Sequence, residues 1–103
     1  AAQRRCTMSS ALLCLLVYDI PDDRRRNRIF KLLKQYGQPM QLSAFEARLS
    51  LAERKQLMRE VSRLLDTRVD RFVLYAIGKE QERGILSFGP PRPEIKQATY
   101  YLV

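Results

Sequence analysis

A continuous apolar run near the N-terminus constrains the fold of this chain more than any other feature. Residues 11–19 read ALLCLLVYD, and Pro21 follows almost at once. An apolar run of this length that ends at a proline is typical of a strand buried on both faces. A buried helix is the alternative, but the run is short for a helix and the proline would stop it. We therefore predict a central strand over residues 11–19.

Two amphipathic helices follow from the spacing of apolar residues. The first is predicted over residues 23–36, with Asp22 or Asp23 as its N-cap and Gly37 ending it in the left-handed conformation. The second is predicted over residues 51–66, because Ser50-Leu51-Ala52-Glu53 is a capping box that precedes a helical stripe of apolar side chains.

The remaining segments favour strands. Residues 38–48 alternate between apolar and polar, and the alternation slips by one near residues 43–45. The slip indicates either a bulge or a short strand that passes into a second one. Further strands are predicted at residues 71–77, 85–88 and 98–103, with a charged turn at 78–84 between the first two.

This order of elements predicts an α+β chain with a ferredoxin-like βαββαβ plan, an antiparallel sheet and a short extra C-terminal strand. The domain spans residues 11–89, after a flexible N-terminal extension at 1–10. Residues 90–103 form a tail that we expect to pack on a dimer partner. Because the strand at 11–19 is apolar throughout, the helix-free face of the sheet needs a cover, and a second copy supplies one.

The charge of the chain indicates a polyanionic partner. Nineteen Lys and Arg oppose eleven Asp and Glu, which gives a net charge of +8. Such a field attracts DNA, RNA or anionic lipid, although a basic surface with no partner is the alternative. The longest apolar run is too short to cross a membrane. With no histidine in the chain, Ser-His and Cys-His catalysis and Cys/His zinc sites are excluded. Two cysteines without a disulfide framework fit a reducing, cytoplasmic setting.

Half of the net charge lies at the start of the first helix. Residues 22–34 hold six basic against two acidic side chains. Cations near a helix N-terminus oppose the helix dipole, so their presence there favours a bound anion. Arginine binds phosphate with a planar fork. We therefore predict a nucleic-acid-binding cluster, with a solvated basic face as the alternative, at Arg24, Arg25, Arg26 and Arg28.

Asp19 closes the apolar strand directly before this cluster. A carboxylate at a strand end is rigidly held and exposed, and Mg²⁺ is usually held by one or two carboxylates with water and substrate oxygens. Asp19 is therefore the candidate metal ligand and catalytic residue, for Mg²⁺ or Mn²⁺, and a symmetric dimer would bring two copies together. Asp22 and Asp23 could assist from the same loop. The alternative is a carboxylate that only shapes the turn.

Two residues of the 38–48 segment are further candidates. Ser43 can bond a phosphate, and Phe45 can stack on a base or pack in the core, of which core packing is favoured. Near the C-terminus, Tyr100 and Tyr101 can stack on bases or serve an edge strand.

These residues together resemble the CRISPR-associated protein two family, the small partner of the spacer-integrating enzyme. The resemblance covers residues 11–89 and rests on 16–23 (LVYDIPDD), on Arg26-Asn27-Arg28, on 41–46 (QLSAFE) and on 73–75 (VLY). It implies a ferredoxin-like homodimer in which the last strand pairs onto the partner's sheet. Residues 1–10 and the proline-rich turn at 90–93 depart from the family pattern.

The resemblance also implies an activity. Members are described as metal-dependent endonucleases of RNA or double-stranded DNA, and as bridges between CRISPR integrase subunits that hold the DNA to be inserted. The metal-binding aspartate of the family falls on Asp19, with Tyr18 beside it, the helix arginine on Arg26, and the strand residues on Ser43 and Phe45.

The sequence leaves two functions open. One is a metal-dependent endonuclease, including an endoribonuclease acting on single-stranded RNA, and the other is a structural DNA-binding adaptor with no catalysis. A third possibility, RNA binding by the sheet surface as in RRM domains, requires exposed aromatics on central strands, where residues 11–19 offer leucines.

Overall fold

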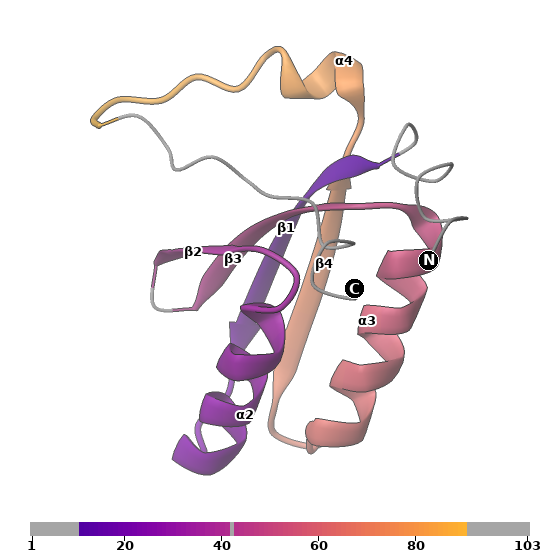
Figure 1. Cartoon of the computed structure of the whole chain (residues 1–103). Coiled ribbons are helices and arrows are strands. Elements are labelled where there is room, and N and C mark those ends of the chain that lie inside the picture. The colour runs from indigo at the N-terminus through magenta and orange to yellow at the C-terminus, as the bar shows by residue number, and fades with distance from the viewer. Residues whose placement is uncertain (1–10, 42, 91–103) are drawn as a thin grey trace.

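The computed structural model describes residues 11–41 and 43–90, which form a four-stranded sheet and three helices (Figure 1). In chain order the elements are β1 (Leu12–Asp19), α2 (Asp23–Leu33), β2 (Gln38–Gln41), β3 (Ala44–Leu49), α3 (Leu51–Leu64), β4 (Arg71–Ile77) and α4 (Lys79–Glu82). The sheet order is β2-β3-β1-β4 and every pairing is antiparallel, which confirms the ferredoxin-like prediction. The predictions for residues 1–10, for the tail beyond residue 90 and for Tyr100 and Tyr101 lie outside the described residues.

The apolar run forms the strand predicted for it. β1 lies between β3 and β4, so both of its edges are hydrogen-bonded. Cys14, Leu16 and Tyr18 point to one face, where they join the buried core. The other face carries Leu13, which is buried, and Leu15 and Val17, which are only partly covered. The described residues thus bury one face of this central strand fully and the other only in part.

Both long helices cover that buried face, as Figure 1 shows for α2 and α3. α2 begins at its N-cap Asp22, whose side chain accepts a hydrogen bond from the Arg25 N–H, and α3 begins with the predicted capping box of Ser50 and Glu53. Phe45 is completely buried between the two layers, with its ring edge against Phe30, so its predicted role in packing is confirmed. The remaining buried core residues from these elements are Ile29, Leu33, Ala47, Leu49, Leu57 and Val61.

The first helix ends earlier than predicted, and Gly37 does not end it in the left-handed conformation. α2 stops at Leu33, whose carbonyl accepts hydrogen bonds from both Tyr36 and Gly37. Within residues 11–41 and 43–90, Gly89 alone has a positive φ. Gly37 is needed for space instead, because a Cβ at this position would lie 2.1 Å from the carbonyl oxygen of Glu46 on β3.

The break in the apolar–polar alternation of residues 38–48 marks the turn between two strands. β2 ends at Gln41 and β3 begins at Ala44, and the β2–β3 register shifts between Pro39 and Gln41. Pro39 faces Phe45 and Gln41 faces Ala44, so Met40 is the extra residue of a bulge. Proline is tolerated here because β2 is an edge strand.

The prediction of a strand at residues 85–88 is wrong for this chain. Residues 85–90 make no ladder, and the side chains of Leu86 and Phe88 are exposed. The predicted turn before them contains the short helix α4, which a bidentate pair between Arg48 and Glu82 ties to β3. An apolar stretch becomes a strand only when it pairs with a neighbouring strand, and residues 85–90 pair with none of the four described strands.

Among the described residues no helix is long and apolar enough to cross a bilayer.

Candidate functional site

Asp19 is the last residue of β1 and lies on the helix-free face of the sheet. The antiparallel register places it directly opposite Arg71, the first residue of β4. The carboxylate of Asp19 is exposed and makes no hydrogen bond or ion pair to any residue within 11–41 or 43–90. Its neighbour Tyr18 points to the other face and is buried. Asp19 therefore presents an exposed, unengaged carboxylate from a hydrogen-bonded strand end.

Ser43 is brought to the same end of the sheet. The backbone N–H of Tyr18 donates to the carbonyl of Ser43 at 3.1 Å, so the turn between β2 and β3 flanks the end of β1. The sequence analysis did not single out Arg71. Its position as the first residue of a strand, here one that pairs with β1, could have identified it. Asp19, Ser43 and Arg71 thus share one end of the sheet.

Asp22 and Asp23 do not join Asp19. The Asp22 side chain accepts the Arg25 N–H at 2.9 Å as the helix cap, and Asp23 pairs with Arg26. No group of three acidic or cysteine side chains suited to a metal gathers in the described part of the chain. The donor set on one protomer is therefore a single carboxylate, which still fits Mg²⁺, an ion that keeps several waters and takes one or two carboxylates.

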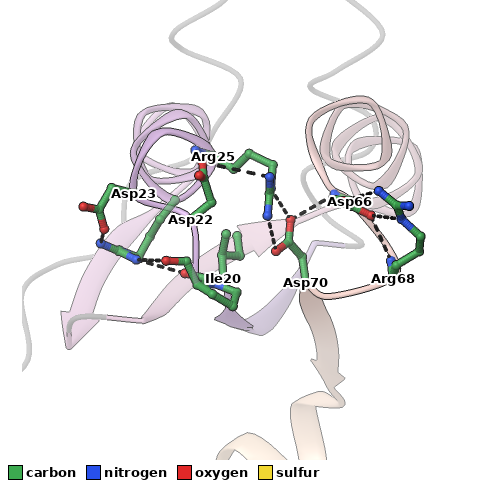
Figure 2. Close-up of polar contacts among 9 residues, drawn as sticks. Ile20, Asp22, Asp23, Arg25, Asp66, Arg68 and Asp70 are labelled. Carbon is green, nitrogen blue, oxygen red and sulfur yellow. Dashed lines mark hydrogen bonds and ion pairs between the residues drawn. The ribbon is translucent and has the colours of Figure 1, made fainter.

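Arg25 holds the fold together instead of facing a ligand. Its Nε and Nη2 donate to the two carboxylate oxygens of Asp70 at 2.6 and 3.1 Å. The Asp70 side chain is fully buried and also accepts the backbone N–H of Asp66 at 2.9 Å (Figure 2). This pair fastens the start of α2 to the loop before β4. The Arg25 guanidinium is thus engaged by a buried carboxylate 45 residues away, and its binding to nucleic acid stays a prediction.

Arg26 is also engaged within the chain. Its Nη1 donates to the carbonyl oxygens of Ile20 at 2.9 Å and Pro21 at 3.3 Å, and its Nη2 pairs with Asp23. These contacts hold the turn that follows Asp19 in its conformation. Arg26 thus supports the turn beside Asp19, and its contact with phosphate stays a prediction.

The two other arginines of the cluster are available. Arg24 and Arg28 are exposed, and their guanidinium groups make no hydrogen bond or ion pair within residues 11–41 and 43–90. Lys31 follows three residues after Arg28 on the same exposed helix surface. Of the four arginines predicted to bind phosphate, Arg24 and Arg28 are thus the two that are exposed and unengaged within the described residues, and Lys31 lies beside them.

Hydrogen bonds from arginines lower the pKa values of three carboxyl groups in this region. The side chain and then the backbone N–H of Arg68 hold the pKa of Asp66 at about 2. A hydrogen bond from the Arg25 side chain lowers the pKa of Asp70, and the Arg25 backbone N–H lowers that of Asp22. All three carboxylates are thus stabilised in their charged form by folding.

We expect acid to destabilise the protein within a defined window. Because these pKa values are depressed in the folded state, the pairs contribute fully above the unfolded value, about pH 4, and their contribution is lost as the pH falls towards 2. Urea midpoints followed by circular dichroism should therefore fall between pH 4.5 and pH 2.5. Asp70→Asn should show a smaller fall than the unmodified chain, and an equal fall in both would contradict this assignment.

Comparison with known proteins decides the family. The profile of the family described as CRISPR associated protein Cas2 matches residues 12–85. The chain belongs to the Cas2 family. A Cas2 relative from Thermus thermophilus, named CRISPR-associated endonuclease Cas2 2, is 40% identical over 85 residues, which cover 82% of this chain and 91% of the relative. One from Synechocystis, named CRISPR-associated endoribonuclease Cas2 1, is 31% identical over 81% of this chain and 93% of its own length.

Solved structures agree with this Cas2 assignment. Streptococcus pyogenes Cas2 superposes with a TM-score of 0.66 at 26% identity, covering 76% of this chain and all of that one. A hypothetical protein from Thermus thermophilus gives a TM-score of 0.70 at 35% identity, covering 84% of this chain and 99% of the other. The ferredoxin-like fold and the family resemblance are therefore both confirmed.

Proposed function

We propose that this Cas2 family member binds nucleic-acid phosphates beside the end of β1 and hydrolyses phosphodiester bonds of RNA or double-stranded DNA with Mg²⁺ or Mn²⁺. The observation that carries the proposal is the exposed, unengaged carboxylate of Asp19 close to the start of the helix that bears Arg24 and Arg28. The endonuclease and endoribonuclease names of the relatives support it.

Asp19 is the residue that would hold the metal. When bound, Mg²⁺ or Mn²⁺ supplies Lewis acidity and an activated water, which a chain without histidine lacks. The chain itself contributes the position of this carboxylate. β1 is paired on both edges, and Arg26 holds the carbonyl groups of the turn after Asp19, so the carboxylate sits on a rigid support.

A homodimer would complete the site. On the helix-free face of the sheet, Leu15, Val17 and Val73 are only partly covered and Tyr75 is 55% exposed. Such an apolar sheet face needs a partner, and a second copy related by a two-fold axis offers the same surface. Because Asp19 lies on this face, such pairing would bring two copies of the carboxylate towards one another.

The phosphate clamp is assigned to Arg24, Arg28 and Lys31, with the Ser43 hydroxyl as a neutral donor. Guanidinium groups bind phosphate in a fork and contribute a sequence-independent, salt-dependent affinity. Arg25 and Arg26 act through the fold, since their side chains are engaged by Asp70 and by the turn carbonyl groups.

The second candidate is a structural adaptor for CRISPR spacer acquisition. The same free arginines would grip DNA, and the dimer would bridge integrase subunits without chemistry. The observation that favours it is that Arg24 and Arg28 need no metal to bind a duplex backbone. Under this alternative, Asp19 contributes nothing measurable to DNA binding.

A cleavage assay separates the two candidates. In Mg²⁺ or Mn²⁺, Asp19→Asn should cleave single-stranded RNA or duplex DNA at least about a hundredfold more slowly than the unmodified chain, because the metal loses its ligand. Glu80→Gln is the matched control and should cleave at the unmodified rate, since it neutralises an exposed carboxylate on α4 that pairs with Arg83, beyond the opposite end of β1. Equal rates for Asp19→Asn and the unmodified chain would leave only the adaptor.

A further inference from the structure

A groove of about 790 Å³ opens between α2 and the edge strand β2, on the helix side of the sheet. Its apolar lining comes from Phe30, Pro39 and Met40, and its polar lining from Asn27 and Gln41, with Tyr18 and Arg26 completing it. A concave site that combines apolar walls with a few polar groups is the usual form of a small-ligand site. Asp19 lies on the opposite face of the sheet, so the groove is separate from the proposed metal position.

We propose that this groove receives one unpaired base of a single-stranded nucleic acid whose phosphates lie along α2. The inference rests on the proposed nucleic-acid binding and names its substrate class. The apolar walls, the free amides and the neighbouring cations each contribute one part of the argument.

The apolar walls offer a platform for a flat ring. Phe30 is held in place by an edge-to-face contact with Phe45, with ring centroids 5.3 Å apart. Met40 is 47% exposed, although it is apolar, and it is the bulged residue of β2. Bulges often re-aim a side chain next to a functional site, and here the bulged residue Met40 lines the groove. Bases stack readily on such surfaces whatever their identity.

The polar walls match the edge of a base. Asn27 and Gln41 are exposed, and their side-chain amides make no hydrogen bond to another residue in the described ranges. Each amide carries one acceptor and one donor group, which is the pattern that base edges present. The third polar group, Arg26, is held by Asp23 and the Ile20 carbonyl. Its side chain is therefore already ordered at the groove before a ligand binds.

The charge around the groove fits the backbone of the same strand. Arg24 lies three residues before Asn27 and Lys31 four residues after it, so both neighbour Asn27 on the helix surface. Lys34 lies with its Nζ 5.7 Å from the centroid of the Phe30 ring. A base entering beside Asn27 would therefore have cations within reach of its flanking phosphates. A duplex holds its bases in pairs, so a single strand is the occupant that these contacts favour.

Binding to intact and abasic RNA tests the proposal. Fluorescence anisotropy would be measured in EDTA, with a labelled single-stranded RNA and with the same strand carrying abasic sites. The unmodified protein should bind the intact strand about tenfold more tightly than the abasic one, as one stacked base contributes. Met40→Ala and Asn27→Ala should each remove most of this difference.

Two matched variants control for general effects. Met58→Ala removes a methionine of similar exposure, 41%, from α3, and Gln35→Ala removes an exposed amide from the chain just after α2. Both should keep the tenfold preference. Equal binding of intact and abasic RNA by the unmodified protein would overturn the base site yet leave the phosphate clamp standing. Equal preference in Met40→Ala and the unmodified protein would overturn it as well.

Because EDTA removes the metal, cleavage plays no part in this measurement. A preference for intact RNA that Met40→Ala abolishes would support the base site even if Asp19→Asn cleaved normally. Absence of any binding to RNA or DNA would overturn both the base site and the proposed function.

Discussion

Replacing Gly37 with alanine should lower the free energy of unfolding by more than about 3 kcal/mol, because the added methyl has nowhere to go. The new Cβ would lie 2.1 Å from the Glu46 carbonyl oxygen and 2.7 Å from the Ala47 Cβ. Both atoms belong to β3, which is hydrogen-bonded to β1 on one side and β2 on the other. β3 cannot move away from residue 37 without losing hydrogen bonds to β1 and β2, so the substitution should destabilise the whole sheet.

Chemical denaturation followed by circular dichroism measures this effect. Gly84→Ala is the matched control, since a Cβ there would meet only the Gln81 carbonyl oxygen at 3.4 Å, an ordinary contact. We expect Gly84→Ala to unfold at nearly the midpoint of the unmodified chain. A Gly37→Ala protein with that same midpoint would show that the backbone at residue 37 can move away from β3 at little cost, contrary to the packing described.

Reversing the charge of the two free arginines should have the largest effect on nucleic-acid binding. In a dimer, Arg24→Glu with Arg28→Glu would remove four phosphate contacts, which lowers the slope of log affinity against log salt by about 3.6. At 100 mM salt this corresponds to an affinity loss on the order of 10³-fold. The protein should remain folded, because neither side chain makes a hydrogen bond or ion pair within residues 11–41 and 43–90.

The second helix supplies a control with the same change in charge. Arg59 and Arg63 are exposed and have the same four-residue spacing on α3. Arg59→Glu with Arg63→Glu should weaken duplex binding far less and change its salt slope little. Equal losses in the two double variants, measured by anisotropy at several salt concentrations, would mean that net charge alone governs binding and would contradict a clamp on α2.

The sequence by itself determined the elements whose signals are local. The eight-residue apolar run predicted β1, and the capping box at Ser50 and Glu53 predicted the start of α3. These succeed because helix caps and apolar periodicity depend on residues within a few positions of one another. The position of Asp19 at a strand end followed in the same way, since the length of the apolar run and the proline after it predict where the strand ends.

Only the tertiary structure decided which arginines are engaged within the chain. Arg24 to Arg28 look alike in the sequence, yet Arg25 is engaged by Asp70 of a distant loop while Arg24 and Arg28 stay exposed. The role of Gly37 and the groove beside Met40 also depend on the tertiary structure, because both are set by how closely β3 and α2 approach residues 37–41. Packing between distant segments sets these features, and no local periodicity encodes which partner a side chain will meet.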